Sequence, residues 1–466
     1  MKRCSTLQPQ LSTGWPVILY LFLALALVRS RGLFTPDTVI ALSVGVLMLW
    51  VWSPRAGPRA VDRARWLIVG WVACSLMLAV RPGLLYGTGG LSNRVFLAGL
   101  YVNLAAAVVA SVRVSRASTA AVTGPLVVGL CSLVLCWCLV ISASPRPVID
   151  VHLILTDGAK ALWKGSNPYA VQYDDIYQRL YGKALYAAYY TPRYLYWPLV
   201  LFWQALFVKY ADIRWSYVVG HVVGWLGIWR LLTFLGYSRK DALAALLVWL
   251  SFPVGFLVLE QAWTDALFVP MVAWGSYWLL RRQWVWFAVA LGLLMGVKQY
   301  SVFYVLLSCA FVWRVAAVKT ALTVLALAGA IFFAVLLPFL VADPLLFLHR
   351  TVTDILRYPV RPDALSWPAL LATCCGARLP AMLVGSGYAG ALSVTLWRIR
   401  FQPDFGASDL ALHLALVYAV VFLLGKQAFC NYYYFLALLA YILALLHLAP
   451  GLADVNMADV GRTVRA

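Results

Sequence analysis

The sequence predicts an all-α, polytopic membrane protein with about 13–15 transmembrane helices. Of its 466 residues, 64% are hydrophobic and only 12% are charged, and the mean hydropathy is +0.84. Soluble domains are roughly 45–50% apolar and about 25% charged. The 37 Lys and Arg residues outnumber the 17 acids and give a net charge of +20. Because they are spread over short hydrophilic breaks, with no continuous basic face, a nucleic-acid partner is excluded and the lipid bilayer is the predicted environment.

The apolar stretches are long enough for helices that cross the bilayer. A span needs about 20 largely apolar residues, and about fourteen stretches approach that length. The first of them follows Met1-Lys2-Arg3, and we expect an uncleaved span there because no soluble domain follows it. The stretches are residues 17–30, 37–53, 66–81, 95–113, 122–143, 215–235, 241–258, 264–280, 283–297, 300–316, 320–341, 379–397, 408–425 and 430–449.

Basic residues in the short breaks predict the orientation of these helices. With the N-terminus in the cytoplasm, every short inside loop carries at least two Lys or Arg, as in Arg239-Lys240 and Arg281-Arg282. This is the pattern that the positive-inside rule requires. Most of the acids then fall outside. Because acids contribute little to orientation, their position is better explained by function.

Residues 196–208 do not fit the series of spans. They are apolar and aromatic but short, and counting them as a crossing would place Arg239-Lys240 on the wrong side. We expect a re-entrant or interfacial helix at the outer surface, where Trp and Tyr are favoured. Two outer loops remain, at residues 144–214 and 342–378. The predicted division is 1–120 as N-terminal helices of unassigned role, 121–450 as the module carrying both loops, and 451–466 as a cytoplasmic tail.

The first outer loop contains the residues best suited to chemistry. Asp150 follows the fifth span directly, and a short amphipathic helix after it is expected to stop at Gly165 and turn at Asn167-Pro168. Aromatic side chains gather further along the loop. They belong to an interfacial belt, stack on a sugar, or line a groove for an isoprenoid chain. They are Tyr186, Tyr189, Tyr190, Tyr194, Tyr196 and Trp197.

The pattern of this loop resembles the GT-C superfamily of membrane glycosyltransferases, and within it the family 87 mannosyltransferases that use polyprenyl-phosphate sugars. The shared features are an acid just beyond a span, then LxxGxNPY, then a Tyr/Trp-Pro entry into the next apolar helix. The stretches LEQAWTDALFVPMVAWGSYWLLRRQ, GLLMGVKQY and YPVRPDALSWPALL also agree, so the resemblance covers residues 144–380. It implies a GT-C-like fold, a lipid-linked sugar donor and Asp150 as the general base.

The sequence departs from the family pattern in three places. The family's Tyr-Pro-Pro reads Tyr196-Trp197-Pro198, and its Gly-Gln reads Glu260-Gln261. Five spans, rather than one, precede the first loop, so the resemblance assigns no role to the N-terminal helices.

The residue types in these loops also suit glycosyl transfer when the resemblance is set aside. An acceptor hydroxyl must lose its proton while a phosphate leaves, and a carboxylate within hydrogen-bond reach typically contributes about 10²–10⁴ in rate as the base. Asp150 is the candidate base. Cationic donors stabilise the leaving phosphate. The expected donors are Lys298, Arg350, Arg357 and Arg361, with His349 beside them.

Several of these residues also have a structural interpretation. Asp150 could cap a helix, and Asp157, about two helical turns later on nearly the same face, is the second candidate base. Two carboxylates at this spacing could share a divalent cation, and no other cofactor is predicted. Lys298 lies between two spans, where a charge costs about 2.5–3.5 kcal/mol on insertion scales. It therefore needs an anionic partner, snorkels to the interface, or binds phosphate.

The remaining polar candidates have two interpretations each. Glu260, the only glutamate, is either solvated at an outer turn or placed near the sugar or a metal ion. The pair His349-Arg350 is either solvated or contacts phosphate. The five His do not cluster with carboxylates and the nine Cys form no CxxC pair, so no tight structural metal site is predicted.

Taken together, these features predict a glycosyltransferase of the cell envelope, in the bacterial plasma membrane, with its active site on the extracytoplasmic side. It would move mannose or a related sugar from a polyprenyl-phosphate carrier to a glycolipid or glycan acceptor. One alternative is a transporter or flippase of lipid-linked or small-molecule substrates, which predicts paired discontinuous helices and charges near the midplane. Another is a polymerase or ligase of envelope glycans.

Overall fold

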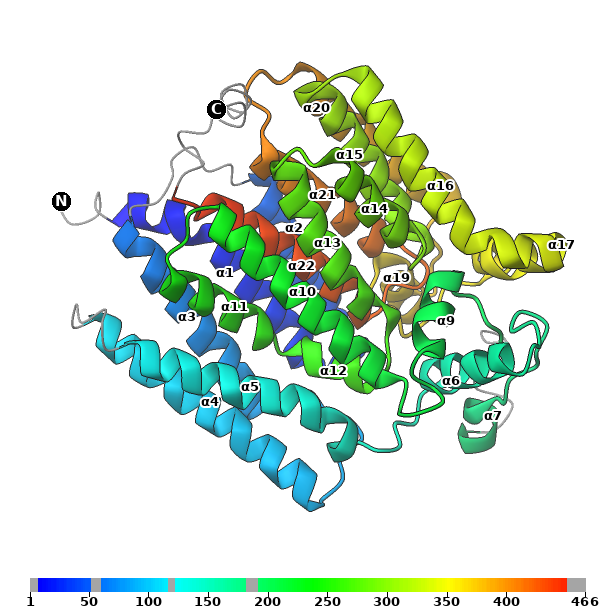
Figure 1. Ribbon diagram of the computed structural model, residues 1–466, viewed down its shortest axis with the longest axis horizontal. Coiled ribbons are helices and arrows are strands. Elements are labelled where there is room, and N and C mark those ends of the chain that lie inside the picture. The colour runs from blue at the N-terminus through cyan, green and yellow to red at the C-terminus, as the bar shows by residue number, and fades with distance from the viewer. Residues whose placement is uncertain (1–6, 52–59, 116–121, 182–191, 451–466) are drawn as a thin grey trace.

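The computed structural model describes residues 7–51, 60–115, 122–181 and 192–450. Within these ranges the chain forms helices and no strand, which confirms the all-α prediction (Figure 1). The tail at 451–466 and the side chains of Tyr186, Tyr189 and Tyr190 lie outside the described residues.

Every predicted apolar stretch forms a helix or a pair of helices. Those of the N-terminal part are α1 (Leu7–Arg29), α2 (Pro36–Val51), α3 (Ala60–Val80), α4 (Leu91–Ser115) and α5 (Thr123–Ala143). The later ones are α10 (Arg214–Phe234), α11 (Arg239–Leu250), α12 (Val254–Glu260), η2 (Thr264–Leu267), α13 (Phe268–Leu280), α14 (Trp284–Met295), η3 (Gln299–Ser301), α15 (Val302–Val315), α16 (Val318–Ala342), α20 (Ala381–Phe401), α21 (Ala407–Leu423) and α22 (Cys430–His447).

The lengths of these helices make the chain a multi-pass membrane protein. Among the described residues, six helices are long and apolar enough to cross a membrane, or seven if the bent pair α11 and α12 is one span. Other apolar stretches form shorter helices of 10–17 residues. The predicted total of about 13–15 spans therefore includes helices that do not reach the usual spanning length by themselves.

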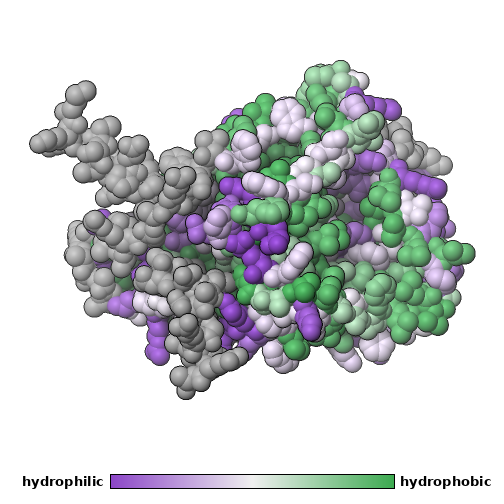
Figure 2. All heavy atoms as spheres, turned by 90° about the horizontal axis from the view of Figure 1, so that it is seen from above, coloured by the Kyte–Doolittle hydropathy of each residue, from purple (hydrophilic) through white to green (hydrophobic). Residues whose placement is uncertain are grey.

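Apolar side chains cover much of the outside of the molecule. On α16, Phe333, Leu337 and Val341 follow one another at helical spacing and are 60%, 57% and 75% exposed. Figure 2 shows hydrophobic residues over large parts of one face. Exposed apolar area of this extent is expected where helices contact lipid instead of water.

The N-terminal helices share a hydrophobic core with the rest of the bundle. α1 packs against α22, the last helix described, and α3 packs against α11. The buried side chains from Trp15 to Ala449 form one connected cluster. The boundary expected near residue 120 is therefore not a boundary between separate cores.

A break between α11 and α12 bends this pair by 55°. Pro253 lies at the break, where it cannot donate a backbone hydrogen bond. Side chains of the N-terminal helices donate to carbonyls beside the break: Trp137 Nε1 lies 3.1 Å from the Leu250 oxygen and the Tyr20 hydroxyl 3.3 Å from the Val248 oxygen. Backbone groups at membrane depth need such internal partners.

The two outer loops form short helices on one side of the bundle. The first contains α6 (Asp150–Trp163), α7 (Ile176–Tyr181) and α9 (Pro198–Ala205), and the second contains α17 (Pro344–Leu348), η4 (His349–Thr353), α18 (Asp354–Arg357) and α19 (Trp367–Cys375). In Figure 1, α6, α7, α9 and α17 lie toward one side, while the start of α5 lies on the opposite side. The eight residues of α9 are too few to span a bilayer, as the re-entrant or interfacial interpretation requires.

Candidate active site

Helix α6 carries Asp150 as its first residue. The helix ends at Gly165, which has φ of +72°, so the predicted stop signal is confirmed. One face of α6 is buried against α9. At Gly158 an added Cβ would lie 2.7 Å from the ring of Tyr194, so only a residue without a side chain permits this approach. The helix is therefore seated closely on the bundle, with Asp150 fixed at one end.

Asp150 is hydrogen-bonded to a tyrosine that the sequence did not indicate. The hydroxyl of Tyr177, on α7, donates to Asp150 Oδ1 at 2.9 Å. Burial and the nearby Asp150 carboxylate raise the pKa of Tyr177 above its ordinary value. Tyr177 therefore stays protonated and acts as a donor to the carboxylate. Asp150 is half-buried, as a group open to a substrate would be.

Arg361 brings the second outer loop to this carboxylate. Its guanidinium forms a bidentate hydrogen bond with the Asp363 carboxylate: Nε donates to Oδ1 at 2.9 Å and Nη2 donates to Oδ2 at 2.8 Å. Burial opposes the charge, but Asp363 and then Asp150 raise the pKa of Arg361. The backbone N–H of Arg361 donates to the carbonyl of Lys426 at 3.0 Å, and its guanidinium lies over the ring of Phe429. Arg361 is thus a fixed cation near Asp150.

A second group of polar side chains surrounds Asp265, which is fully buried on η2. Lys298 Nζ lies 2.6 Å from Asp265 Oδ2, and the hydroxyl of Tyr300 and the amide of Asn431 also donate to this carboxylate. The anionic partner that Lys298 requires is therefore Asp265. An ammonium has three donor hydrogens, so this ion pair leaves donor capacity for a ligand.

Two tyrosines connect the Asp150 and Asp265 groups. The charges of Asp150 and Asp265 both reach Tyr196, and the ammonium of Lys298, the partner of Asp265, lies 4.5 Å from the ring centroid of Tyr432. Burial and the charge of Asp150 raise the pKa of Tyr196 above its ordinary value. The predicted site residues Asp150, Tyr196, Lys298 and Arg361 therefore belong to one region, to which both outer loops contribute.

His349 and Arg350 lie together around Asp354. Arg350 and Arg193 each have a guanidinium nitrogen 3.1 Å from Asp354 Oδ2, and His349 Nδ1 lies 3.3 Å from Oδ1. Burial raises the pKa of Asp354, but the hydrogen bonds from Arg350 and Arg193 lower it below its ordinary value. Because two arginines share the single carboxylate of Asp354, this group of side chains carries a net positive charge. The segment His349–Thr353 is a π-helix, a rare form that often marks functional sites.

An apolar cavity of about 300 Å³ lies between Trp197, the residue before α9, and the second loop, with residues of α14, α15 and α16 in its wall. Gln299 crosses its polar end, since its amide donates to the carbonyls of Leu195 at 3.2 Å and Thr351 at 3.0 Å. Thr351 directly follows Arg350, and Gln299 directly follows Lys298. The side chains of Lys298 and Arg350 themselves do not line the cavity. It is lined mainly by Trp197, Met295, Val302, Phe332, Val352, Ile355 and Leu356.

Asp157 and Arg357 are less well placed for a role in the site than Asp150 and Arg361. Asp157 pairs with Lys160 at 3.4 Å, and its side chain is 44% exposed. Burial, and then the charge of Asp157, raise the pKa of Tyr173. Arg357 is exposed at the end of α18. Within the described residues, no three or more His, Cys, Asp or Glu side chains are grouped so that they could hold a metal ion.

Glu260 has a role that differs from both sequence interpretations. It is fully buried, and its two carboxylate oxygens accept the backbone N–H groups of Leu85 at 2.8 Å and Tyr86 at 2.9 Å. The side chain of Gln261 donates to it at 2.9 Å. Glu260 is therefore neither solvated nor directed at a substrate. It joins α12 to the loop between α3 and α4.

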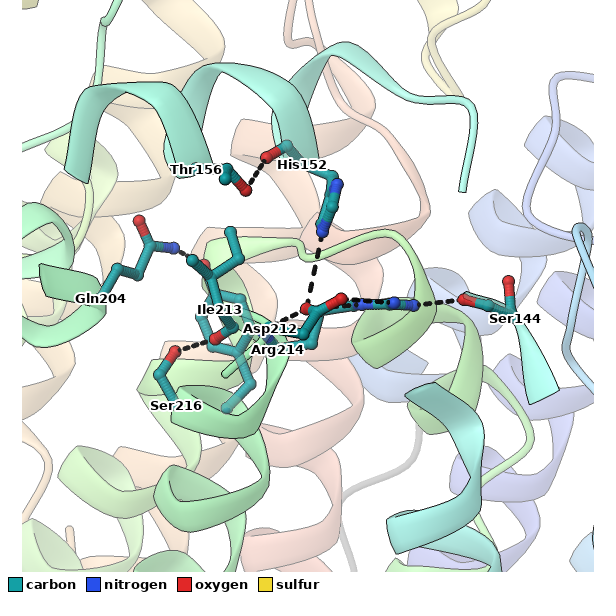
Figure 3. A network of polar contacts seen from close by, with 9 residues as sticks. Ser144, His152, Thr156, Gln204, Asp212, Ile213, Arg214 and Ser216 are labelled. Atoms are coloured by element: carbon teal, nitrogen blue, oxygen red, sulfur yellow. Dashed lines mark hydrogen bonds and ion pairs between the residues drawn. The ribbon is translucent and has the colours of Figure 1, made fainter. Parts of the chain in front are cut away.

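Asp212 lies below α6 in Figure 3 and joins three elements. It forms a bidentate ion pair with Arg214, whose Nε lies 2.9 Å from Oδ1 and whose Nη2 lies 2.7 Å from Oδ2. Its Oδ1 also lies 3.5 Å from Nε2 of His152 on α6. Arg214 also donates to the carbonyl of Ser144, at the end of α5, at 2.8 Å. Burial raises the pKa of Asp212, but the contacts with His152 and Arg214 lower it below its ordinary value. This network holds the beginning of α6 in place from below.

Sequence reasoning did not single out Tyr177, Asp265, Asn431 or Tyr432 as site residues. For Asp265 and Asn431 a signal was available, because each is a polar residue within an otherwise apolar stretch. Comparison with protein-family models, curated proteins and solved structures gives no match to this chain. The arrangement of these side chains is thus what indicates a function.

Proposed function

We propose that the protein is a GT-C-type membrane glycosyltransferase of the bacterial plasma membrane, acting on the extracytoplasmic side. It transfers mannose or a related sugar from a polyprenyl-phosphate carrier to a glycolipid or glycan acceptor. The proton of the acceptor hydroxyl passes to Asp150. The bond between the anomeric carbon and the phosphate oxygen breaks, its electron pair leaves with the phosphate, and the acceptor oxygen bonds to the anomeric carbon.

The observation that carries this proposal is the convergence of Asp150 and Arg361 from the two outer loops. Asp150 is half-buried and held by Tyr177, while Arg361 is fixed by Asp363 close enough to interact with Asp150. A base and a cation held close together suit a reaction in which a proton leaves one reactant and negative charge develops on the other.

The neighbouring cavity supports a lipid-linked donor. A polyprenyl phosphate has an anionic head and a long apolar tail, and it needs both kinds of contact at once. Trp197 lines the apolar cavity, and its neighbour Tyr196 lies within reach of the charges of Asp150 and Asp265. Lys298 and Arg350 directly precede the lining residues Gln299 and Thr351 in the chain, although they do not line the cavity themselves. The tail would lie in the cavity, and the phosphate would lie outside it, toward Lys298 and Arg350.

A transfer assay in membranes tests the proposal. Wild type, Asp150→Asn and Asp157→Asn are supplied with labelled sugars on polyprenyl phosphates of different chain length. We expect transfer by wild type, a loss of about 10²–10⁴-fold in Asp150→Asn, and nearly normal transfer in Asp157→Asn. Undiminished transfer by Asp150→Asn would exclude it as the base.

A transporter or flippase is the second candidate. The observation in its favour is the break between α11 and α12, because discontinuous helices often form transport sites. Among the described residues this is the one bent pair that is long and apolar enough to span a membrane, and transporters usually contain two such helices in corresponding positions. Movement of a lipid-linked sugar across vesicles without its transfer to any acceptor would favour this alternative.

A further inference from the structure

The loop between α3 and α4 contacts the first outer loop at the segment that leads into Asp150. The hydroxyl of Tyr86 donates to the carbonyl of Val148 at 2.9 Å, two residues before Asp150. Two residues after Tyr86, the backbone N–H of Thr88 donates to the carbonyl of Ala143 at 2.8 Å. This loop therefore holds both ends of the link between α5 and α6.

Tyr86 is itself fixed from the other side. Its backbone N–H and that of Leu85 donate to the two oxygens of Glu260. Gly83, with φ of +79°, lets the loop pass close to the break between α11 and α12, since an added Cβ would lie 2.8 Å from the Pro253 oxygen. Tyr86 thus connects a buried carboxylate of the bundle with the segment before Asp150.

The segment from 144 to 149 depends on such external contacts. Pro145 and Pro147 have no backbone N–H, so the segment has few donors with which to order itself. Arg214 holds its first carbonyl at Ser144, and Tyr86 holds its carbonyl at Val148. These two contacts fix the link directly before α6, in addition to the packing of α6 on α9 and the contact between His152 and Asp212.

We propose that Tyr86 is a positioning residue, which fixes the entry to α6 through its hydroxyl and so holds Asp150 at its place in the site. This inference rests on the proposed function for its catalytic consequence. It gives the N-terminal helices a definite role, because Tyr86 lies on a loop that they carry. Tyr86 acts through Asp150 and does not itself touch a substrate.

The first test is a double-mutant cycle with Tyr86→Phe and Asp150→Asn in the transfer assay. One hydrogen bond lost from a positioning contact should lower kcat about fivefold, with the KM for the donor unchanged. In the Asp150→Asn background, Tyr86→Phe should cause no further loss, because the group that it positions is already disabled. Equal losses in both backgrounds would overturn the proposal. Tyr101→Phe is the matched control, since Tyr101 lies on α4 with 59% of its surface exposed.

The second test does not depend on transfer activity. Hydrogen exchange is measured on purified protein for the peptide that covers residues 148–155. We expect faster exchange in Tyr86→Phe, and also in Glu260→Gln, than in wild type or Tyr101→Phe. Unchanged exchange in both variants would overturn the positioning role. Faster exchange in a protein that transfers no sugar would support this role and overturn only the proposed function.

Discussion

The ammonium group of Lys298 lies 2.6 Å from a carboxylate oxygen of Asp265, and these side chains are only 9% and 0% exposed. The pair joins the start of η3 to η2, two segments that interrupt the apolar helices. Two opposite charges enclosed in this way have each lost their water, so each depends on the other. The ion pair therefore anchors the inner part of the candidate site.

Removing one member of this pair should destabilise the protein more than removing both. In Asp265→Asn the ammonium is left buried without a counter-charge, which costs about 3–5 kcal/mol. The double variant Asp265→Asn with Lys298→Met has no uncompensated charge, so we expect it to regain most of the lost stability. Thermal unfolding of the purified protein in detergent measures both. A double variant less stable than Asp265→Asn would contradict this account.

The exposed pair Arg29 and Asp37 provides the control, because its side chains are 72% and 46% exposed. Water solvates each charge when the partner is removed, and exposed pairs contribute about 0–1 kcal/mol. Asp37→Asn should therefore leave the melting temperature almost unchanged.

Asp212 should make the stability depend on pH. Because its pKa is lowered in the folded state, its stabilisation is present above the unfolded-chain value of about 3.9 and is lost as the pH falls below it. At pH 7, Asp212→Asn leaves the buried Arg214 unpaired, so the variant should melt at a lower temperature than wild type. The difference should shrink as the pH falls below about 4. Melting curves at several pH values measure this.

A matched substitution at an exposed aspartate separates this effect from a general change in charge. Asp404 is exposed, and Asp404→Asn removes the same formal charge. Its melting temperature should follow wild type at every pH. If the gap between wild type and Asp212→Asn stayed constant down to pH 3, Asp212 would not be the group responsible.

The apolar cavity should discriminate between donors by the length of their lipid. Val352→Trp would fill part of it, and the loss of contact with about two methylene groups should raise the KM for a long-chain polyprenyl donor about tenfold. A donor with a tail of one or two isoprene units should be affected much less. Transfer rates at varied donor concentration give both values.

Leu345→Trp is a suitable control because Leu345 lies on α17, is 81% exposed and does not line the cavity. It should leave the KM unchanged for both donors. If Val352→Trp raised the KM equally for long-chain and short-chain donors, the cavity would not hold the lipid tail.

The helices were predictable from the sequence because their signal is local. A run of apolar residues in a membrane must form a helix that satisfies its own backbone, so the stretches at 122–143 and 320–341 correspond closely to α5 and α16. The stop at Gly165 and the short α9 after Trp197-Pro198 also follow from neighbouring residues. The break between α11 and α12 was not predicted, although Pro253 marks it.

The contacts of the candidate site were harder to predict because they join distant segments. The charge of Lys298 implied an anionic partner, but nothing local indicated that this partner is Asp265. Tyr177 and Asp150 are separated by 27 positions, and Tyr86 and Val148 by 62. Glu260 was misjudged because a carboxylate at a turn is usually solvated, whereas here two backbone N–H groups from another loop replace water.

The bend at Pro253 has a consequence for the integrity of the whole chain. The carbonyls of Val248 and Leu250 accept hydrogen bonds from Tyr20 and Trp137, which belong to α1 and α5. Without those helices, the Leu250 oxygen would lose the donor Trp137, and the Val248 oxygen would keep only the hydroxyl of Ser251, at a depth where water cannot replace the missing donors. A fragment that lacks both α1 and α5 would therefore lose two of the contacts that satisfy the bent helix pair in a bilayer.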